Sequence, residues 1–124
     1  MNVLSTGIII NSGDPDRLRS FYRDIVGLPG QPAREEALSV AGVTVDFDRH
    51  SEVSGPAKEP ARILFDLFVD DIAAEEARIA AHGVKFIRSQ GKEYWGGVIS
   101  TFADPDGNLV QLMYFDPTAA QASA

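Results

Sequence analysis

The sequence contains no cysteine, and this absence excludes several kinds of chemistry. Without a thiol the chain can form no disulfide bond, no cysteine-ligated zinc site and no thiol nucleophile. Histidine is scarce as well, because His50 and His82 are the only two. We expect His82 in the last turn of a helix, where a partly positive imidazole suits the helix dipole, and His50 on the surface after a strand. Neither position indicates a metal ligand.

Positive charge is also in short supply. The chain has 11 lysine and arginine residues against 18 aspartate and glutamate residues, which gives a formal net charge of −7. The basic residues are scattered along the sequence, whereas a nucleic acid or an anionic membrane attracts a concentrated basic face. The composition therefore predicts a protein with no nucleic-acid partner and no membrane partner.

Long hydrophobic runs are absent too. Near the N-terminus, the apolar run Ile8–Ile10 is far shorter than a signal-peptide core or a membrane span, and no basic leader precedes it. We therefore expect a cytoplasmic protein.

The first half of the chain has the pattern of one strand, one helix and several short strands. Residues 3–10 are rich in β-branched side chains and predict a strand. Asp14-Pro15 is typical of a helix start, and the apolar residues that follow are spaced as on one helix face until Gly27. Alternating apolar residues within 30–49 predict short strands that turn at Ala41-Gly42.

The second half repeats this plan. A strand at 63–69 precedes a helix that begins after Asp71 and ends at Gly83, and three further strands are expected at 84–89, 98–103 and 109–115. The last two strands are joined by a turn at 104–108, in which Pro105 fixes φ and Gly107 accepts positive φ. A repeat of this size indicates two related modules.

The size of the chain is that of one domain. Its 124 residues, 44% of them hydrophobic, can form one sizeable core and are too few for two ordinary domains. We therefore predict a single domain over residues 1–124. It comprises module one at about 1–50, a polar Gly- and Pro-containing loop at about 51–60, module two at about 61–116 and a frayed tail at 117–124.

Several stretches of the sequence resemble one known family, the vicinal oxygen chelate superfamily of glyoxalases, bleomycin-resistance proteins and extradiol dioxygenases. The resemblance spans nearly the whole chain. Its most specific parts are the Phe21-Tyr22-Arg23-Asp24 helix and the closing strand, turn and strand. The matching stretches are residues 8–14, 21–24, 27–28, 68–72 and 102–112.

The resemblance implies an α+β fold of paired βαβββ modules. In this family the modules form a cupped mixed β-sheet around a cavity, and the helices lie on its outer face. Members of this length are usually homodimers, so the resemblance also implies a second copy of the chain as a partner.

The family's metal ligands are missing from this chain. Enzymes of the family hold a divalent ion through a histidine on the opening strand, a histidine on the first strand of module two and a glutamate on the last strand. Alignment on the two helix starts and the closing turn places Gly7, Leu64 and Gln111 at these positions. Glycine and leucine offer no donor, and glutamine offers only a neutral carbonyl oxygen. The resemblance therefore implies a member with no metal site and no cofactor.

No other catalytic constellation is present in the sequence. A GxSxG elbow, a P-loop, an HExxH helix and a GxGxxG turn are all absent. Glu36, Asp46, Asp48 and Asp66 could assemble an oxygen-ligand site, although a solvated strand face explains them more simply. A carboxylate that acts as a base without metal would need burial or a like-charged neighbour to reach a useful pKa. Whether the chain is an enzyme stays open at this point.

A metal-free cavity favours a binding function. Small-molecule sites are usually apolar concavities with a few aimed polar groups. If Gln111 faces the cavity, strand alternation sends Leu109, Met113 and Phe115 the same way. Trp95, which precedes Gly96-Gly97, could stack on a planar cation. The predicted ligand-binding residues are Phe47, Leu64, Asp66, Phe68, Tyr94, Trp95, Phe102, Gln111 and Met113.

Three functional hypotheses follow. The first, which we favour, is a metal-free protein of the bleomycin-resistance type that binds a hydrophobic or cationic drug or metabolite as a dimer. The second is an enzyme of the family, a lyase, isomerase or dioxygenase, with a divergent or metal-free site. The third is a degenerate module that acts as a protein partner.

Overall fold

The computed structural model describes residues 1–116 and 118, and the chain divides into two compact units. Unit 1 spans Met1–Pro56 and unit 2 spans Ala57–Ala124. The boundary falls inside the loop expected at 51–60, so each unit holds one of the two expected modules. That the two units together form a single domain stays a prediction.

Unit 1 contains one helical segment and four strands in a mixed sheet. Strand β1 pairs in parallel with β4, and the sheet order is β1-β4-β3-β2. Helix α1 continues directly into a π-helical turn, η1, which ends at Gly27 in the left-handed conformation that favours glycine. The elements are β1 (Gly7–Asn11), α1 (Pro15–Ser20), η1 (Phe21–Val26), β2 (Gly30–Gln31), β3 (Arg34–Val40) and β4 (Val43–Asp48).

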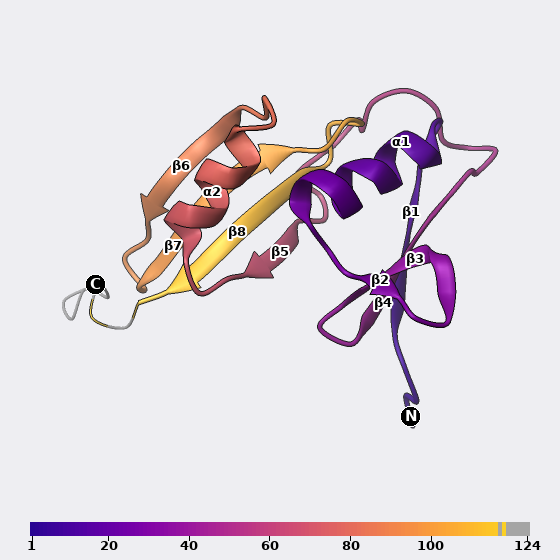
Figure 1. Cartoon of the computed structure of the whole chain (residues 1–124), viewed down its shortest axis with the longest axis horizontal. Coiled ribbons are helices and arrows are strands. Elements are labelled where there is room, and N and C mark those ends of the chain that lie inside the picture. The colour runs from indigo at the N-terminus through magenta and orange to yellow at the C-terminus, as the bar shows by residue number, and fades with distance from the viewer. Residues whose placement is uncertain (117, 119–124) are drawn as a thin grey trace. The chain divides into compact units, whose positions relative to one another are not determined.

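Unit 2 repeats this topology. Its first strand, β5, pairs in parallel with its last, β8, and the sheet order is β5-β8-β7-β6 (Figure 1). The elements are β5 (Phe65–Phe68), α2 (Ile72–Ala80), β6 (Phe86–Lys92), β7 (Gly97–Ala103) and β8 (Leu109–Phe115). In both units the first strand pairs with the fourth, which confirms an α+β fold built from two βαβββ modules.

Aspartate starts the helix of each unit, as the sequence predicts. A carboxylate oxygen of Asp14 accepts a hydrogen bond from the backbone N–H of Arg17, and Asp71 accepts one from Ala74 at 3.0 Å. Each carboxylate satisfies one of the N–H groups that the first helical turn leaves without a backbone partner. The same cap therefore sets where each helix leaves its strand.

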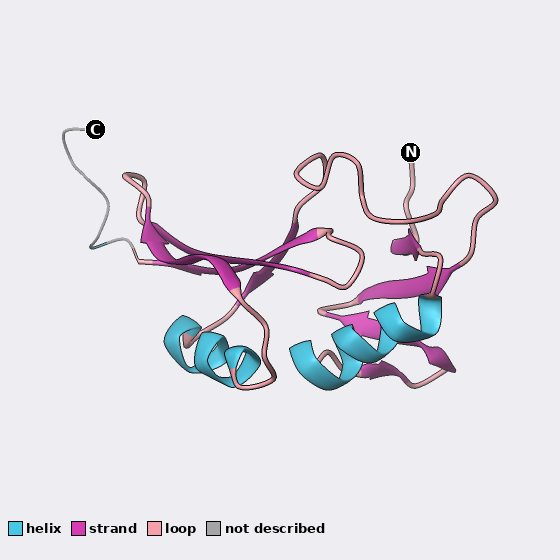
Figure 2. Ribbon diagram, turned by 90° about the horizontal axis from the view of Figure 1, so that it is seen from above, coloured by secondary structure: helices cyan, strands magenta, loops and turns pink. Residues whose placement is uncertain are grey.

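The core of each unit lies between its helix and one face of its sheet. In unit 1 the buried ring of Tyr22 stacks on Phe47 of β4, with centroids 5.5 Å apart. In unit 2, Ile79 of α2 is buried, and so are Val110 and Leu112 of β8. Figure 2 shows α2 on one side of the unit 2 sheet. Full burial of each large apolar side chain contributes about 1.5–3 kcal/mol.

The turn at 104–108 sets the register between β7 and β8. The buried carboxylate of Asp104 accepts hydrogen bonds from the backbone N–H groups of Asp106 and Asn108 and from the side-chain amide of Asn108. Gly107 adopts a φ of 86°, as the sequence predicts for this position. This register places Thr101 opposite Gln111.

Glu76 fastens α2 to the sheet of unit 2. Its two carboxylate oxygens accept hydrogen bonds from the hydroxyl groups of Ser100 on β7, at 2.6 Å, and Ser89 on β6, at 2.5 Å. Burial alone would raise the pKa of Glu76, but the hydrogen bonds from Ser100, Ser89 and Gln90 outweigh it and hold the pKa below its ordinary value. The charged form of Glu76 therefore stabilises the fold.

Replacing Glu76 by alanine is expected to lower the free energy of unfolding by about 1–3 kcal/mol, because two hydroxyl groups lose a charged acceptor. Since folding lowers the pKa, the stabilisation is present above the unfolded pKa and is lost as the pH falls through the folded pKa. Urea denaturation at neutral and acidic pH measures both effects. Glu75→Ala is the control, because Glu75 pairs with Arg78 on the partly exposed side of α2. An equal loss in both variants would contradict the role of Glu76.

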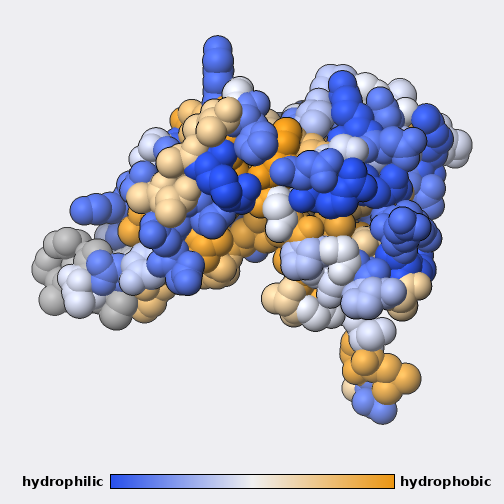
Figure 3. All heavy atoms as spheres, in the orientation of Figure 1, coloured by the Kyte–Doolittle hydropathy of each residue, from blue (hydrophilic) through white to orange (hydrophobic). Residues whose placement is uncertain are grey.

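Three strands, β1, β5 and β6, have a boundary that differs by two residues or more from the expected one. The first strand was expected at 3–10 but begins at Gly7, and the apolar residues before it, among them Met1 and Leu4, are exposed (Figure 3). Strand β5 is shorter than the expected 63–69. Strand β6 runs to Lys92 rather than ending at Ser89, because Gln90 with a φ of 47° forms an irregularity past which the pairing resumes.

The expected tail at 117–124 lies outside the described residues, apart from Thr118. Among the described residues, no helix combines the length and apolar character that crossing a membrane requires.

Candidate functional site

The candidate site is the face of the unit 2 sheet that points away from α2, which we call the far face. Ser100 donates its hydroxyl to Glu76 of α2, and Val110 and Leu112 are buried on that same side. Successive side chains on a strand point to opposite faces. The far face therefore carries Asp66, Phe68, Arg88, Gly91, Gly97, Ile99, Thr101, Leu109, Gln111, Met113 and Phe115.

A polar row crosses the far face. It consists of Asp66 on β5, Gln111 on β8, Thr101 on β7 and Arg88 on β6, each paired in register with the next. The amide nitrogen of Gln111 donates to the hydroxyl of Thr101 at 3.4 Å. Because neighbouring strands lie about 4.8 Å apart, the row extends about 14 Å across the sheet. All four side chains of the row are polar, but Thr101 is buried and Arg88 pairs with Glu93.

An apolar row runs beside the polar row. It consists of Phe68, Met113 and Ile99, and it ends at Gly91. Met113 and Ile99 are buried, whereas the ring of Phe68 is 69% exposed. Two parallel rows of opposite polarity therefore lie next to each other on the same sheet.

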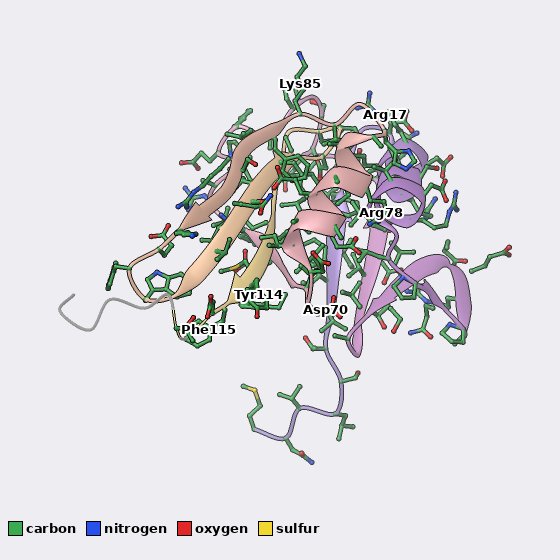
Figure 4. All side chains as sticks on the ribbon, turned by 60° about the vertical axis from the view of Figure 1, so that its left-hand side comes forward. Arg17, Asp70, Arg78, Lys85, Tyr114 and Phe115 are labelled. Atoms are coloured by element: carbon green, nitrogen blue, oxygen red, sulfur yellow. The ribbon has the colours of Figure 1, made fainter. Side chains whose placement is uncertain are left out.

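An aromatic plate, made of Trp95 and Phe115, lies beside the apolar row, on the side opposite the polar row. The indole of Trp95 lies against Gly97, so closely that an added Cβ at Gly97 would lie 2.1 Å from Cη2 of Trp95. The indole is nearly parallel to the ring of Phe115, with an interplanar angle of 12° and centroids 6.4 Å apart. Phe115 and Tyr114 lie at the end of β8 (Figure 4). Trp95 and Phe115 are 40% and 51% exposed, so the plate is accessible.

The glycines beside Trp95 explain how the indole reaches the sheet. The backbone N–H of Gly96 donates to the carbonyl of Glu93 to close the turn between β6 and β7, and Gly96 has a φ of 96°. Gly97 then leaves the space that the indole fills. A Gly-Gly pair can form a plain bulge or leave room for another group to lie close to the backbone. In the structure Gly96 belongs to the turn, and the indole of Trp95 occupies the space above Gly97.

Asp66 is the electrostatic feature of the polar row. Its carboxylate is exposed and has no hydrogen bond or ion pair with any other described residue. Partial burial among its neighbours raises the pKa of Asp66 above its ordinary value, because no donor offsets the loss of solvation. Arg88, at the other end of the row, pairs instead with Glu93 at 2.8 Å and lies over Gly91.

The structure brings some of the predicted ligand-binding residues together and separates others. Asp66, Phe68, Gln111 and Met113 share the far face. Alternation about Gln111 predicts this for Met113, and the pairing of β5 with β8 adds Asp66 and Phe68. Trp95 lies on the same face, over Gly97. Leu64 directly precedes β5 and is 40% exposed, and Tyr94 is exposed in the turn before Trp95.

Phe47 and Phe102 lie in the two cores and not on the far face. Phe47 stacks on Tyr22 in unit 1, and Phe102 is fully buried on the α2 side of β7, edge-on to Phe86. Both rings are buried in a core, so neither belongs to the candidate site. The sequence alone does not show which face of a strand is covered by a helix, and this is why both rings were predicted as ligand-binding residues.

Three far-face residues were missed by the sequence reasoning. Ile99, Thr101 and Arg88 join the site only through the pairing of β6, β7 and β8. Alternation along β7 could have grouped Ile99 with Thr101, but the signal that relates them to Gln111 is the register set by the turn at 104–108. The irregularity in β6 hides Arg88 from any alternation rule.

The residues at the family's metal positions do not fit a divalent ion. Leu64 has no donor atom, and an added Cβ at Gly7 would lie 3.2 Å from the carbonyl oxygen of Thr44, so a larger side chain would require Thr44 to shift. Gln111 is engaged with Thr101 through its amide nitrogen and retains one neutral oxygen. Within residues 1–116 and 118, no group of three or more histidine, aspartate or glutamate side chains is placed to hold a metal ion.

Solved structures share this fold over nearly the whole chain. A glyoxalase-family protein from Bacillus anthracis is 17% identical with a TM-score of 0.72, and 94% of this chain and 98% of that chain are covered. A protein from Agrobacterium tumefaciens is 25% identical with a TM-score of 0.70 and coverages of 92% and 94%. An antibiotic-binding protein from Streptomyces is 24% identical with a TM-score of 0.69 and coverages of 94% and 99%.

The sequence also matches a family model. The comparison with curated proteins finds no match. The family model of the Glyoxalase/Bleomycin resistance protein/Dioxygenase superfamily matches residues 5–112, which include every helix and nearly every strand of both units. The chain therefore belongs to the Glyoxalase/Bleomycin resistance protein/Dioxygenase superfamily.

Proposed function

We propose that this chain binds a flat, largely apolar small molecule on the far face of unit 2, without a metal ion. The observation that carries the proposal is the aromatic plate of Trp95 and Phe115, which lies on the same face as Phe68 and Asp66. Exposed apolar side chains that cluster beside a few polar groups are typical of ligand sites.

The energetics favour a planar ligand. Phe68, Trp95 and Phe115 present apolar surface that a ligand would remove from water, and such burial contributes about 25 cal/mol per Å². An aromatic ring placed on the plate would add about 0.5–1.5 kcal/mol from ring geometry. The rings are large and have few rotatable bonds, so ordering them costs little.

One of the relatives supports a binding function. A protein of the same fold binds an antibiotic, so this fold can hold a small organic molecule. Membership in a family that includes glyoxalases reflects ancestry, and function has to be argued from the site. The positions of the family metal in this chain lack the donors that metal-dependent catalysis needs. We therefore place the enzyme and protein-partner hypotheses behind the binding hypothesis.

The proposal includes a homodimer in the cytoplasm, which the resemblance and the composition favour. Native mass spectrometry of the full chain, before and after incubation with Zn²⁺, Ni²⁺, Mn²⁺ or Fe²⁺, measures both the oligomeric state and the metal content. We expect a dimer that retains none of the four ions. Retention of one ion per chain would overturn the metal-free proposal, and a monomer would overturn the dimer.

Replacing Phe68 by alanine is expected to weaken binding of the neutral dye N-phenyl-1-naphthylamine about fivefold, because the far face loses an exposed ring. Dye fluorescence, titrated with the full chain, measures the affinity. Val53→Ala removes an exposed apolar side chain in the loop of unit 1 and serves as the control. If the unmodified chain fails to bind the dye, or if both variants weaken it equally, the far face is not the binding site.

A further inference from the structure

Each module carries one carboxylate within an equivalent cross-strand pair, on the fourth strand in module one and on the first strand in module two. Ile9 and Asp46 pair across β1 and β4, and Asp66 and Gln111 pair across β5 and β8. Both pairs join the first and fourth strand of a module. Ile9 and Asp66 also stand at the same spacing before the aspartates that begin α1 and α2. The pairs Ile9–Asp46 and Asp66–Gln111 are therefore counterparts, and each contains a single carboxylate.

The two carboxylates differ in what they contact. In unit 1, the guanidinium group of Arg34 forms an ion pair with Asp46. In unit 2, Asp66 has no such partner in the described part of the chain. The basic side chain on its face, Arg88, lies three strands away at the other end of the polar row and pairs with Glu93. Module one thus supplies an internal planar cation to its carboxylate, and module two supplies none.

We propose that the ligand of the far face carries a planar amidinium or guanidinium group, which Asp66 and Gln111 hold, while its aromatic part lies over Phe68 and toward the plate of Trp95 and Phe115. This inference rests on the proposed function and names the chemical class of its ligand. Arg34 on Asp46 is the counterpart of this contact within the chain.

The neighbouring side chains fit such a group. Gln111 donates its amide N–H to Thr101, so its carbonyl oxygen is left as an acceptor next to the carboxylate of Asp66. An amidinium has several N–H donors in one plane and can bridge two adjacent acceptors. It is also more weakly hydrated than an ammonium, so it costs less to place beside the apolar row.

The pH dependence follows from the same contact. Partial burial raises the pKa of Asp66, and a bound cation favours its charged form. As the pH falls through the pKa of Asp66, protonation removes the negative charge and the affinity for the cation is lost. The other titratable groups on this side of the sheet, Arg88 and Glu93, pair with each other. The loss should therefore begin at a higher pH than an ordinary aspartate would give.

Two isosteric probes test the proposal on the full chain. 2-Naphthamidine carries the planar cation, and 2-naphthamide has the same shape without charge. We expect calorimetry to show the amidine binding about tenfold more tightly than the amide, which corresponds to one charge-assisted hydrogen bond. Asp66→Asn should remove this difference and leave the amide unchanged. Gln111→Glu, which adds a second carboxylate, should increase it.

The controls separate this inference from the proposed function. Glu52→Gln removes one negative charge from an exposed loop and should leave both affinities unchanged. 2-Naphthylmethylamine, an ammonium, should bind several-fold more weakly than the amidine. Equal binding of amidine and amide overturns the inference but leaves the proposed function standing, and equal binding of amine and amidine overturns the planar cation. If neither naphthalene compound binds, the proposed function itself fails.

Discussion

Replacing Gly97 by alanine is expected to weaken the binding of planar ligands about tenfold while the sheet stays folded. The added Cβ would lie 2.1 Å from Cη2 of Trp95, far inside any allowed contact. The clash involves the far end of a side chain in a turn, so the indole can move away without unfolding β7. The plate then loses its larger ring, and with it both stacking and apolar burial, together about 1–2 kcal/mol.

The chain offers a direct readout and a matched control for this prediction. Trp95 is the only tryptophan, so intrinsic fluorescence reports on the plate alone. Gly97→Ala should shift the emission to longer wavelength and increase quenching by acrylamide, and the affinity for N-phenyl-1-naphthylamine should fall. Gly13→Ala is the control, because a Cβ there meets no atom within 4 Å. An unchanged Trp95 spectrum in Gly97→Ala would show that the indole does not rest on Gly97 in solution.

Replacing Phe102 by alanine is expected to lower the free energy of unfolding by about 3–5 kcal/mol. Phe102 is fully buried between α2 and the sheet and packs against Phe86, so its loss leaves a cavity that the surrounding strands cannot close. Domains of this size are stable by about 5–15 kcal/mol in total, so the substitution removes a large share of the stability. Urea denaturation followed by circular dichroism measures the change.

Phe68→Ala provides the comparison for Phe102→Ala. Both substitutions remove a phenylalanine ring from unit 2, but the ring of Phe68 is 69% exposed on the far face. We expect it to cost less than about 1 kcal/mol of stability. If Phe102→Ala instead left stability unchanged and abolished dye binding, the placement of Phe102 in the core would be wrong.

Much of the local structure could be predicted from the sequence, because it depends on neighbours in the chain. Asp14 and Asp71 cap their helices, Gly27 ends one, and the Pro105-Asp106-Gly107 turn joins β7 to β8, each through contacts within a few residues. The bounds of β8 and the far-face direction of Met113 follow from alternation. The lack of side-chain donors at two of the aligned metal positions is equally local, because Gly7 and Leu64 carry none in any fold.

The candidate site depended on contacts between distant residues, and these the sequence does not reveal. In the sequence, Phe47 and Phe102 are as good candidates for ligand contact as any other aromatic residue on a strand. Either face of a strand can be the one that a helix buries, and only the packed structure shows which face it is. The contact of Trp95 with Gly97 depends on the turn between β6 and β7. A turn has no helical or strand periodicity, so the sequence does not predict where its side chains point.

Charge partners were the least predictable feature of all. The sequence shows Asp46 and Asp66 as similar residues on alternating strands, and only the pairing of strands puts Arg34 beside Asp46 and no basic group beside Asp66. The sequence by itself determined the repeat, the family and the absence of metal donors, because each depends on which residues are present. The tertiary structure alone decided which faces are buried and that, among the described residues, Asp46 has an ion-pair partner while Asp66 has none, because burial and ion pairing depend on residues that meet only after the chain has folded.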